Sequence, residues 1–337
     1  MAELQKLTPK DFKSDQEVRW CPGCGDHAIL NAVQKTMANL GIPKEDFAVI
    51  SGIGCSSRFP YYMDTYGFHG IHGRGAAIAS GVKVANPKLS VWQITGDGDA
   101  MAIGGNHFIH LIRRNIDINL LLFNNEIYGL TKGQYSPTSH LGIKTKTSPF
   151  GTVENPFHPG ELVIGAQGRF FARGIDNQVK ALVDIFEESA RFKGTSVVEV
   201  LQNCVIFNDG IHEKIVNKNV RDDRTIYLKH GEKMIFGKER DKGLVRDGLK
   251  LKVVTIGKDG YTIEDILTHD AHEANPGMHL MLANMRHPEY PVALGIIRAV
   301  PTATYEDLLD QQIEEVKSSS KIKNMDDLLH TGETWTV

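Results

Sequence analysis

Residues 91–99, which read Val-Trp-Gln-Ile-Thr-Gly-Asp-Gly-Asp, place two aspartates directly after a short apolar strand. After Gly98, 25 residues pass before the pair Asn124-Asn125, and this interval holds an expected helix and a second apolar strand. Strands joined through a helix run parallel, and the carboxyl ends of parallel strands meet at one edge of the sheet. The stretch therefore predicts a parallel α/β unit with acidic and amide side chains gathered at its carboxyl edge.

The same alternation of strands and helices continues on both sides of this unit. The expected strands are apolar on both faces, as in parallel sheets that helices cover on both sides. We therefore predict an α/β fold with a doubly wound, mostly parallel sheet and helices on both faces. Helices are expected over residues 26–40, 75–85, 105–114, 178–192 and 306–318, strands over 47–51, 91–95, 118–123 and 196–201, and a long loop over 131–157.

The composition is that of an ordinary globular protein, with 41% hydrophobic and 23% charged residues in a chain of 337. A formal net charge of −3 gives no indication of a nucleic-acid partner. No apolar run reaches the roughly 18 residues of a membrane-spanning helix, and residues 1–16 lack the apolar core of a secretory signal. We therefore expect a cytoplasmic protein with no membrane or nucleic-acid partner.

Asp97 and the asparagine pair suit a magnesium ion that neutralises a bound diphosphate. Mg²⁺ takes oxygen ligands in an octahedron, some from the protein and the rest from phosphate and water. Gly96 and Gly98 would let the backbone approach the diphosphate, and the helix that begins near Gly104 would direct its positive end toward it. A plain Gly-Asp-Gly turn is the alternative. The sequence has no P-loop motif, and Met101 stands where a dinucleotide fingerprint requires Gly or Ala.

The four cysteines form a second candidate site. Cys21 and Cys24 occupy a Cys-x-x-Cys motif, whereas Cys55 and Cys204 each follow an expected strand. Zinc ribbons use two Cys-x-x-Cys pairs and this sequence has one, but two lone cysteines could complete a [4Fe–4S] cluster. A zinc site and unrelated thiols remain the alternatives at this point, and structural disulfides are not expected in a cytosolic chain.

Five short segments occur in an order that is typical of one enzyme family. They read WCPGCG at 20–25, GIGCSS at 52–57, HGRG at 72–75, GDGD at 96–99 and YGLTKGQYSPT at 128–138. Over about residues 15–300 the chain closely resembles the β subunits of the 2-oxoacid:ferredoxin oxidoreductase family, of the type that acts on 2-oxoglutarate. The resemblance implies a thiamine-diphosphate-binding fold and an enzyme that decarboxylates a 2-oxo acid oxidatively with coenzyme A, passing electrons through a [4Fe–4S] cluster to ferredoxin.

The resemblance also implies which residues hold each cofactor. The cluster ligands would be Cys21, Cys24, Cys55 and Cys204. Magnesium would be held by the side chains of Asp97 and Asn125 and by the backbone carbonyl of Ile127, with Glu126 pointing elsewhere. Thiamine diphosphate would contact residues of several loops, namely Ile53, Gly54, Cys55, Ser56, His72, Gly73, Gly98, Asp99, Leu130 and Thr131.

His72 is the candidate catalytic residue, through proton transfer. It could instead donate a hydrogen bond to the diphosphate or only orient its glycine-rich loop. Leu130-Thr131-Lys132 stands where relatives that act on pyruvate carry Asn-Thr-Gly, which favours a larger acid, with 2-oxoglutarate first. Pyruvate and branched-chain 2-oxo acids remain the alternatives.

The chain is expected to have three parts: an N-terminal arm (1–20), a thiamine-diphosphate-binding domain with the cluster site (21–210) and a C-terminal extension (211–337). Residues 211–252 carry twelve Lys and Arg against seven Asp and Glu, which indicates a solvated face or a docking site for an acidic ferredoxin. By the resemblance, thiamine enzymes use a glutamate from a sister domain, for which this chain has no room. An α subunit would bring that glutamate and most contacts to the 2-oxo acid and coenzyme A.

Two hypotheses from other classes stay open at this point. A non-redox thiamine-diphosphate enzyme with structural zinc would be colourless and would contain zinc instead of iron. A metal-stabilised interaction module would have no affinity for thiamine diphosphate.

Overall fold

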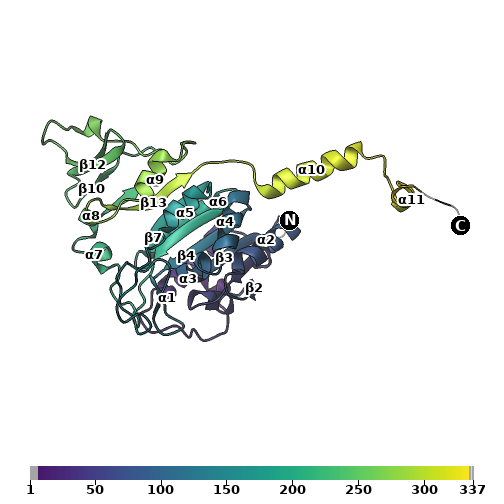
Figure 1. Cartoon of the computed structure of the whole chain (residues 1–337), viewed down its shortest axis with the longest axis horizontal. Coiled ribbons are helices and arrows are strands. Elements are labelled where there is room, and N and C mark those ends of the chain that lie inside the picture. Colours follow the sequence, from purple (N-terminus) through teal and green to yellow (C-terminus); the bar gives the residue numbers. More distant parts are fainter. Residues whose placement is uncertain (1–6, 334, 336–337) are drawn as a thin grey trace.

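The computed structural model describes residues 7–333 and 335, and an eight-stranded sheet forms its centre (Figure 1). The order of strands across this sheet is β2-β1-β3-β4-β8-β7-β13-β9. Their bounds are β1 (Phe47–Ser51), β2 (Tyr66–His69), β3 (Ser90–Gly96), β4 (Ile118–Asn124), β7 (Phe170–Ile175), β8 (Ser196–Leu201), β9 (Thr225–Leu228) and β13 (Val292–Ala299). Two of the five pairings between β2 and β7, namely β1 with β3 and β4 with β8, join strands that are not consecutive in the chain. The strand order therefore grows outward from the centre in both directions, as in a doubly wound sheet.

All neighbouring strands from β2 to β7 pair in parallel. At the far edge β13 pairs antiparallel with β7, and β9 pairs parallel with β13. The predicted fold class, a mostly parallel sheet, is therefore confirmed. Because β1, β3, β4 and β8 run in one direction, the loops that follow them all leave from the same edge.

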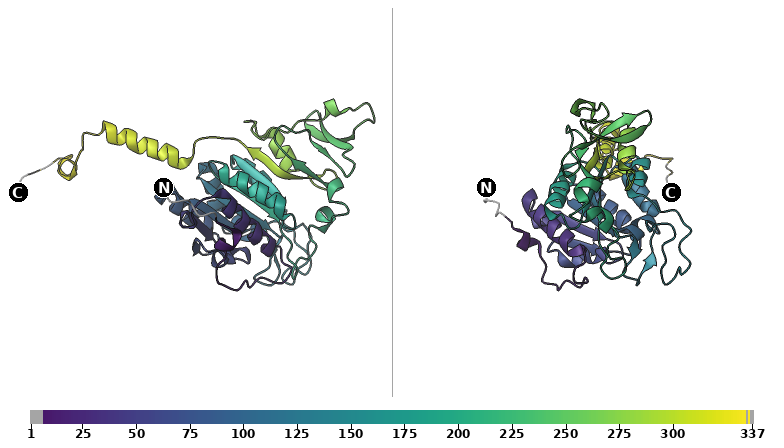
Figure 2. Two further views of the ribbon diagram at one scale, coloured as in Figure 1. Left: turned by 180° about the vertical axis from the view of Figure 1, so that it is seen from behind. Right: turned by 90° about the vertical axis from the view of Figure 1, so that its left-hand side faces the viewer.

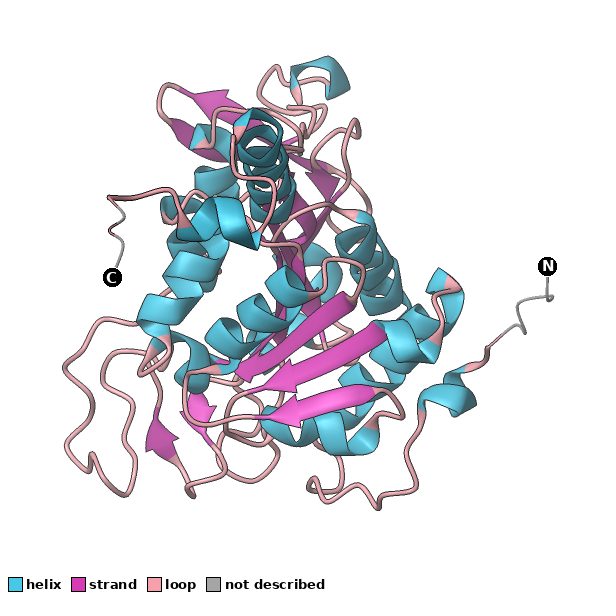
Figure 3. Ribbon diagram, turned by 90° about the vertical axis from the view of Figure 1, so that its right-hand side faces the viewer, coloured by secondary structure: helices cyan, strands magenta, loops and turns pink. Residues whose placement is uncertain are grey.

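Helices cover both faces of the sheet (Figure 3). Helices α1 and α6 pack together against one face, and α2, α4, α5 and α9 contribute to the core on the other face. None of the helices in the described part of the chain combines the length and apolar character that a bilayer crossing requires. The bounds are α1 (Asp26–Leu40), α2 (Gly75–Ala85), α3 (Asp97–Met101), α4 (Gly105–Arg114), α5 (Pro159–Gly165), α6 (Val179–Arg191), α7 (Glu213–Val216), α8 (Arg221–Arg224), α9 (Gly277–Ala283), α10 (Tyr305–Ser319) and α11 (Met325–Leu329).

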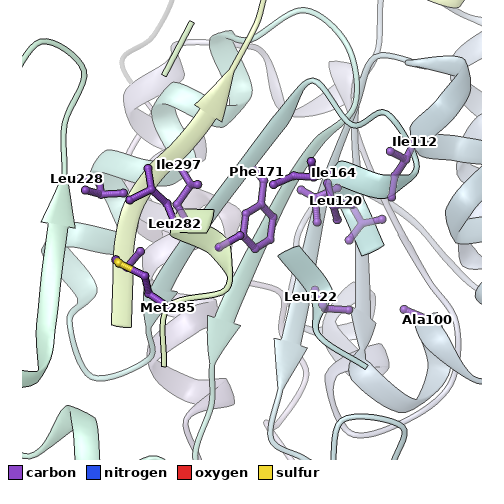
Figure 4. Close-up of a cluster of buried hydrophobic side chains, with 14 of the residues drawn as sticks. Ala100, Ile112, Leu120, Leu122, Ile164, Phe171, Leu228, Leu282, Met285 and Ile297 are labelled. Carbon is purple, nitrogen blue, oxygen red and sulfur yellow. The ribbon is translucent and has the colours of Figure 1, made fainter. Parts of the chain in front are cut away.

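The central strands are buried along their whole length, which explains their continuous apolar sequences. Every residue of β1, β4, β7 and β8 is buried. Figure 4 shows part of the core beneath α4, α5 and α9, where Phe171 of β7 lies between Ile164 and Leu282. Complete burial of a large apolar side chain stabilises the fold by about 1.5–3 kcal/mol. The sheet is thus a rigid support for the loops at its edge.

Most expected elements have the predicted bounds within two residues, and α1, α2 and α4 match them. Helix α1 ends as expected at Gly41, whose φ of 68° only glycine adopts without strain. The strands β2, β7, β9 and β13 were not predicted. A buried arginine, Arg173, interrupts the apolar sequence of β7, and β2 is largely exposed, so these two strands lack a continuous apolar run. Strand β13 does have such a run before Arg298, in the sequence Val-Ala-Leu-Gly-Ile-Ile, and it was overlooked.

Residues beyond 210 lie partly within the main sheet. They supply β9 and β13 and then a separate antiparallel sheet of β10 (Ile235–Phe236), β11 (Lys242–Asp247) and β12 (Lys250–Thr255). Helices α10 and α11 extend away from the body of the molecule (Figures 1 and 2). Residues 1–6 of the expected N-terminal arm lie outside the described residues, and farther along that arm Phe12 and Trp20 are buried.

Arg173 joins the C-terminal strands to the parallel part of the sheet. Its Nε donates to Glu199 Oε2 of β8 at 2.7 Å. Its two terminal nitrogens donate to the carbonyl oxygens of Ala293 in β13 (3.2 Å) and Ala283 in α9 (3.3 Å). Both charged side chains are almost completely buried, so the loss of one partner would leave the other charge without compensation.

The substitution Arg173→Met is therefore expected to lower the free energy of unfolding by about 3–5 kcal/mol, the usual cost of breaking a buried ion pair. Urea denaturation followed by circular dichroism measures this change. The matched control is Arg191→Met, which removes the exposed Arg191–Glu187 pair of α6 (2.9 Å) and should cost at most about 1 kcal/mol. Equal effects of the two substitutions would show that Arg173 does not anchor β13.

Candidate functional site

The loops that leave the carboxyl edge of the sheet enclose a cavity of about 230 Å³. Nine of the ten residues expected to contact thiamine diphosphate line it, together with all three expected magnesium ligands. Gly73 is the exception: it is buried beside the cavity and not in its wall. The lining includes Ile53, Gly54, Cys55, Ser56, His72, Asp97, Gly98, Asp99, Asn125, Ile127, Leu130 and Thr131.

Asp97 is the first residue of α3 and is buried. Its Oδ2 accepts hydrogen bonds from the hydroxyl groups of Ser136 and of Thr138, the latter at 2.5 Å. Burial raises the pKa of Asp97 to about 6, although both hydroxyl groups oppose this shift. The two hydroxyl groups come from the expected long loop, which sequence analysis had not assigned to the site.

The side chain of Asn125 has a defined orientation at the next strand end. Its Nδ2 donates to Gln202 Oε1 at 2.7 Å, and its Oδ1 accepts from the backbone N–H of Ile127 at 3.2 Å. One cavity is therefore lined by three residues that can offer oxygen ligands: Asn125 with its amide oxygen, Asp97 with its carboxylate and Ile127 with its backbone carbonyl. These are the kinds of oxygen ligand that Mg²⁺ prefers.

Asp99 fastens two loops of the cavity to the sheet. Its Oδ1 accepts the backbone N–H groups of Ile53 (3.0 Å) and Gly73 (2.7 Å), and its Oδ2 accepts the hydroxyl group of Thr95 (3.0 Å). The loops are packed so closely that a Cβ at Gly52 would lie 2.0 Å from Asp99 Oδ2. Both carboxylate oxygens of Asp99 thus accept hydrogen bonds from other groups of the chain, and the residue stabilises the loops that border the cavity.

Gly98 is required for a reason that the sequence did not predict. A Cβ at Gly98 would lie 2.2 Å from the ring of Tyr128, whose hydroxyl donates to the Gly98 carbonyl at 3.3 Å. We expected this glycine to leave space for a diphosphate, but the space on that side is filled by Tyr128. At Gly96 a Cβ would make ordinary contact with Ser56 Oγ at 3.5 Å.

All four cysteines line a second cavity, of about 220 Å³. All are free thiols, and the ideal Cβ position of Gly129 lies 3.5 Å from Cys204 Sγ and 3.7 Å from Cys55 Sγ. Within residues 7–333 and 335, no three His, Cys, Asp or Glu side chains converge as ligands of one metal ion do. The sulfur atoms are therefore spread around the wall of this cavity, which Asp26, Cys55, Asn125, Gly129 and Leu130 share with the first cavity.

Two thiols of this second cavity, those of Cys24 and Cys55, have raised pKa values because they are largely buried. Burial raises the pKa of Cys55 to about 12, and it raises the pKa of Cys24 further. Metal binding would release these protons, because thiolate sulfur is the form that ligates. Trp20 closes one side and donates from Nε1 to the Cys55 carbonyl at 2.7 Å. The Cys-x-x-Cys loop and two distant strand ends thus meet behind an aromatic wall.

The remaining candidates lie as follows. His72 is exposed at the rim of the first cavity, and its backbone carbonyl accepts a hydrogen bond from Arg74 at 2.9 Å. Glu126 is buried and lines a different cavity, in agreement with the expectation that it points away. Sequence analysis missed Gln202, which contacts residues of both cavities and whose only signal was its position two residues before Cys204.

A third cavity, of about 390 Å³, adjoins the first and shares Ile53, Gly54 and Leu130 with it. Two arginines, Arg19 and Arg58, lie in its wall. Glu17 of the same wall pairs with Arg19 at 2.9 Å, so Arg58 is the guanidinium group of this cavity that is suited to bind a further carboxylate.

Comparisons with known proteins agree with this arrangement. Residues 52–200 match the family described as "Thiamine pyrophosphate enzyme, C-terminal TPP binding domain". The chain is 45% identical over 331 residues to the 2-oxoglutarate oxidoreductase subunit KorB of Mycobacterium tuberculosis, covering 97% of this chain and 88% of that protein. It is 41% identical over 222 residues to subunit beta of 2-oxoacid:ferredoxin oxidoreductase 2 of Aeropyrum pernix, covering 66% and 70%.

The structure is also similar to a solved structure, 2-oxoglutarate:ferredoxin oxidoreductase from Magnetococcus marinus with 2-oxoglutarate, coenzyme A and succinyl-CoA bound. The TM-score is 0.78 with 31% sequence identity, and the match covers 99% of this chain and 98% of that chain. The similarity therefore includes the residues beyond 210 as well as the parallel sheet.

If Asp99 ties the two loops, Asp99→Ala should release the amides of Ile53 and Gly73. We expect their hydrogen exchange to be about tenfold faster, since a hydrogen bond to a charged acceptor contributes about 1.5–3 kcal/mol. Hydrogen exchange with mass spectrometry of peptides over residues 52–57 and 70–75 measures this. The matched control is Asp99→Asn, which keeps one oxygen for both amides and should largely retain protection. If hydrogen exchange is unchanged in the alanine variant, Asp99 does not hold the two loops in place.

Proposed function

The chain belongs to the 2-oxoacid:ferredoxin oxidoreductase family, and we propose that it is the β subunit of an enzyme that acts on 2-oxoglutarate. In this proposal the subunit holds thiamine diphosphate with Mg²⁺ in the first cavity and a [4Fe–4S] cluster in the second. The reaction is the coenzyme A-dependent oxidative decarboxylation of the acid, with ferredoxin as electron acceptor. The single observation that carries the proposal is that the two cavities share a wall at one sheet edge.

The choice of 2-oxoglutarate rests on the relatives and on the third cavity. The relative from Mycobacterium tuberculosis and the solved structure from Magnetococcus marinus both carry 2-oxoglutarate in their names. A dicarboxylic substrate needs a cationic partner for its distal carboxylate, and Arg19 and Arg58 lie beside the cofactor cavity. Because Arg19 is paired with Glu17 at 2.9 Å, Arg58 is the candidate partner for the distal carboxylate.

The residues of the first cavity fit a magnesium diphosphate. Asp97, Asn125 and the Ile127 carbonyl are the candidate metal ligands, and the remaining octahedral positions would be filled by phosphate and water. Ser136 and Thr138 hold the carboxylate of Asp97, so its orientation is already fixed. Asp99 holds the loops with Ile53 and Gly73 at the opposite side of the cavity.

The donor set of the second cavity fits an iron–sulfur cluster better than a single zinc ion. Four cysteines are the ligands that a [4Fe–4S] cluster requires. A tetrahedral zinc site would need all four sulfurs about 2.3 Å from one point, whereas a cluster would occupy the wider cavity of about 220 Å³ that the cysteines line. The bare face of Gly129 leaves room between Cys55 and Cys204.

In the reaction, each part of the chain has a physical task. Thiamine diphosphate, when bound, supplies the nucleophilic carbon and electron-sink chemistry that decarboxylation of a 2-oxo acid needs. Asp97 and Asn125 fix the diphosphate end through the metal, and the loop of Ile53 and Gly54 forms the wall between cofactor and third cavity. Leu130 borders all three cavities and would help to exclude water from the reacting centre once a partner covers its exposed side.

The structure contains one domain of the thiamine-diphosphate type, and we propose that an α subunit supplies the missing half. The cofactor cavity is open on the side of the exposed His72 and Leu130. A partner that covers this side would exclude water and add the glutamate expected for the pyrimidine ring. Proton transfer by His72 remains a proposal of the same kind, since its side chain lies at the rim where such a partner would meet it.

A crossed pair of substitutions tests the assignment of cofactors to cavities. Asp97→Ala should weaken thiamine-diphosphate binding at least about 100-fold in titration calorimetry with Mg²⁺, because it removes a charged metal ligand, and should leave the iron content unchanged. Cys204→Ala should lose or convert the cluster and leave thiamine-diphosphate affinity within about twofold. A Cys204→Ala protein that keeps four irons, or an Asp97→Ala protein with full affinity, would contradict the assignment.

The proposed activity is tested with the chain alone and with its co-expressed α subunit. The complex should reduce a one-electron acceptor dye in the presence of coenzyme A and 2-oxoglutarate, with kcat/KM at least about tenfold above that for pyruvate or 2-oxoisovalerate, a preference worth about 1.4 kcal/mol. The chain alone should show no such turnover. Coenzyme A-dependent activity of the chain by itself, or a colourless zinc-containing complex, would refute the proposed function.

A further inference from the structure

Gln202 occupies the wall between the two cavities. It directly follows β8 and is 1% exposed. Its side chain lines the cysteine cavity, and it contacts Asn125, which lines both cavities. This buried amide is therefore in contact with a candidate magnesium ligand on one side and with the candidate cluster site on the other.

The amide group of Gln202 makes three hydrogen bonds. Its Nε2 donates to the backbone carbonyl of Asn203 at 2.6 Å and to Cys24 Sγ at 3.3 Å. Its Oε1 accepts from Asn125 Nδ2 at 2.7 Å. The Asn203 carbonyl also accepts the backbone N–H of Gly25 at 3.3 Å, so its position is coupled to the Cys-x-x-Cys loop.

These contacts allow one orientation of both amides. A backbone carbonyl can only accept, so the NH₂ end of Gln202 must face Asn203 and its oxygen must face Asn125. The NH₂ end of Asn125 is then directed to Gln202, which leaves the Asn125 oxygen for the cofactor cavity. The N–H of Ile127, which donates to that oxygen, requires the same orientation. Without Gln202, only the 3.2 Å hydrogen bond from the Ile127 N–H would hold the Asn125 amide in this orientation.

We propose that Gln202 is a positioning residue for both cofactors: it directs the Asn125 oxygen to magnesium and donates an N–H to the sulfur of Cys24. This inference rests on the proposed function, because it assigns Asn125 and Cys24 as ligands. An N–H donor stabilises the extra negative charge that a cluster carries after reduction, so it raises the reduction potential. An oxygen of fixed direction lowers the cost of ordering the metal site.

The test uses Gln202→Met in the complex with the α subunit. Methionine has a similar length but neither donor nor acceptor, so both effects should be lost. We expect the dissociation constant of thiamine diphosphate to rise about tenfold in calorimetry with Mg²⁺. The cluster reduction equilibrium should shift about tenfold toward the oxidised form, which is about 59 mV lower potential in a redox titration followed by electron paramagnetic resonance.

Two further variants separate the roles of Gln202 from a general effect of buried substitution. Gln34→Met changes a buried glutamine of α1 that lines none of the three cavities and should leave both readouts unchanged. Gln202→Glu keeps an acceptor for Asn125 but loses the N–H donor to Cys24. It should retain thiamine-diphosphate affinity within about threefold and still lower the potential.

Iron content and cofactor binding of the wild-type complex are measured first. A wild type without four irons or without thiamine-diphosphate affinity would refute the proposed function itself. With a normal wild type, the inference fails if either readout of Gln202→Met equals that of Gln34→Met. It also fails if Gln202→Glu loses as much affinity as Gln202→Met, or if both Gln202 variants lose the cluster, which would give Gln202 a structural role only.

Discussion

Parallel pairing of β1, β3, β4 and β8 is the constraint on which the site depends. Because these strands run in one direction, the residues that follow them meet at one edge although they are far apart in sequence. Cys55, Asp97, Asn125 and Cys204 are brought together in this way. The buried strands make the edge rigid, so short loops can hold a defined geometry.

The two aspartates of the Gly-Asp-Gly-Asp motif, Asp97 and Asp99, have different hydrogen-bond partners and therefore different roles. Asp97 accepts hydroxyl groups on one oxygen and faces the cavity, and burial raises its pKa because ionised carboxylate is poorly solvated there. Asp99 lies two residues later and accepts two backbone amides and a hydroxyl group. Its carboxylate therefore serves the loops, while that of Asp97 remains suited to a metal.

The two candidate cofactor cavities share a wall at the carboxyl edge of the sheet. A Cβ at Gly129 would lie within contact distance of two sulfurs, and Gln202 joins Asn125 to Cys24. A larger residue at position 129 would lie between the candidate cluster and the candidate cofactor. Because the two cavities share lining residues, a rigid wall between them is suited to the proposed reaction.

The sequence by itself determined the fold class, the bounds of most helices and the residues that line the first cavity. It could do so because continuous apolar strands and glycine-rich strand ends are local patterns, and the family resemblance rests on such local segments. It did not reveal β7, because the buried Arg173 interrupts the apolar sequence of this strand and finds its partners only in the folded chain.

Only the tertiary structure decided the remaining features of the site. The ring that makes Gly98 necessary belongs to Tyr128, 30 residues later, and the hydroxyl groups on Asp97 come from residues 136 and 138. Gln202 has no sequence motif, since its role follows from the distance between its amide and two groups that lie 77 and 178 residues away. Contacts of this kind depend on how strands are ordered in the sheet, which a single sequence does not encode locally.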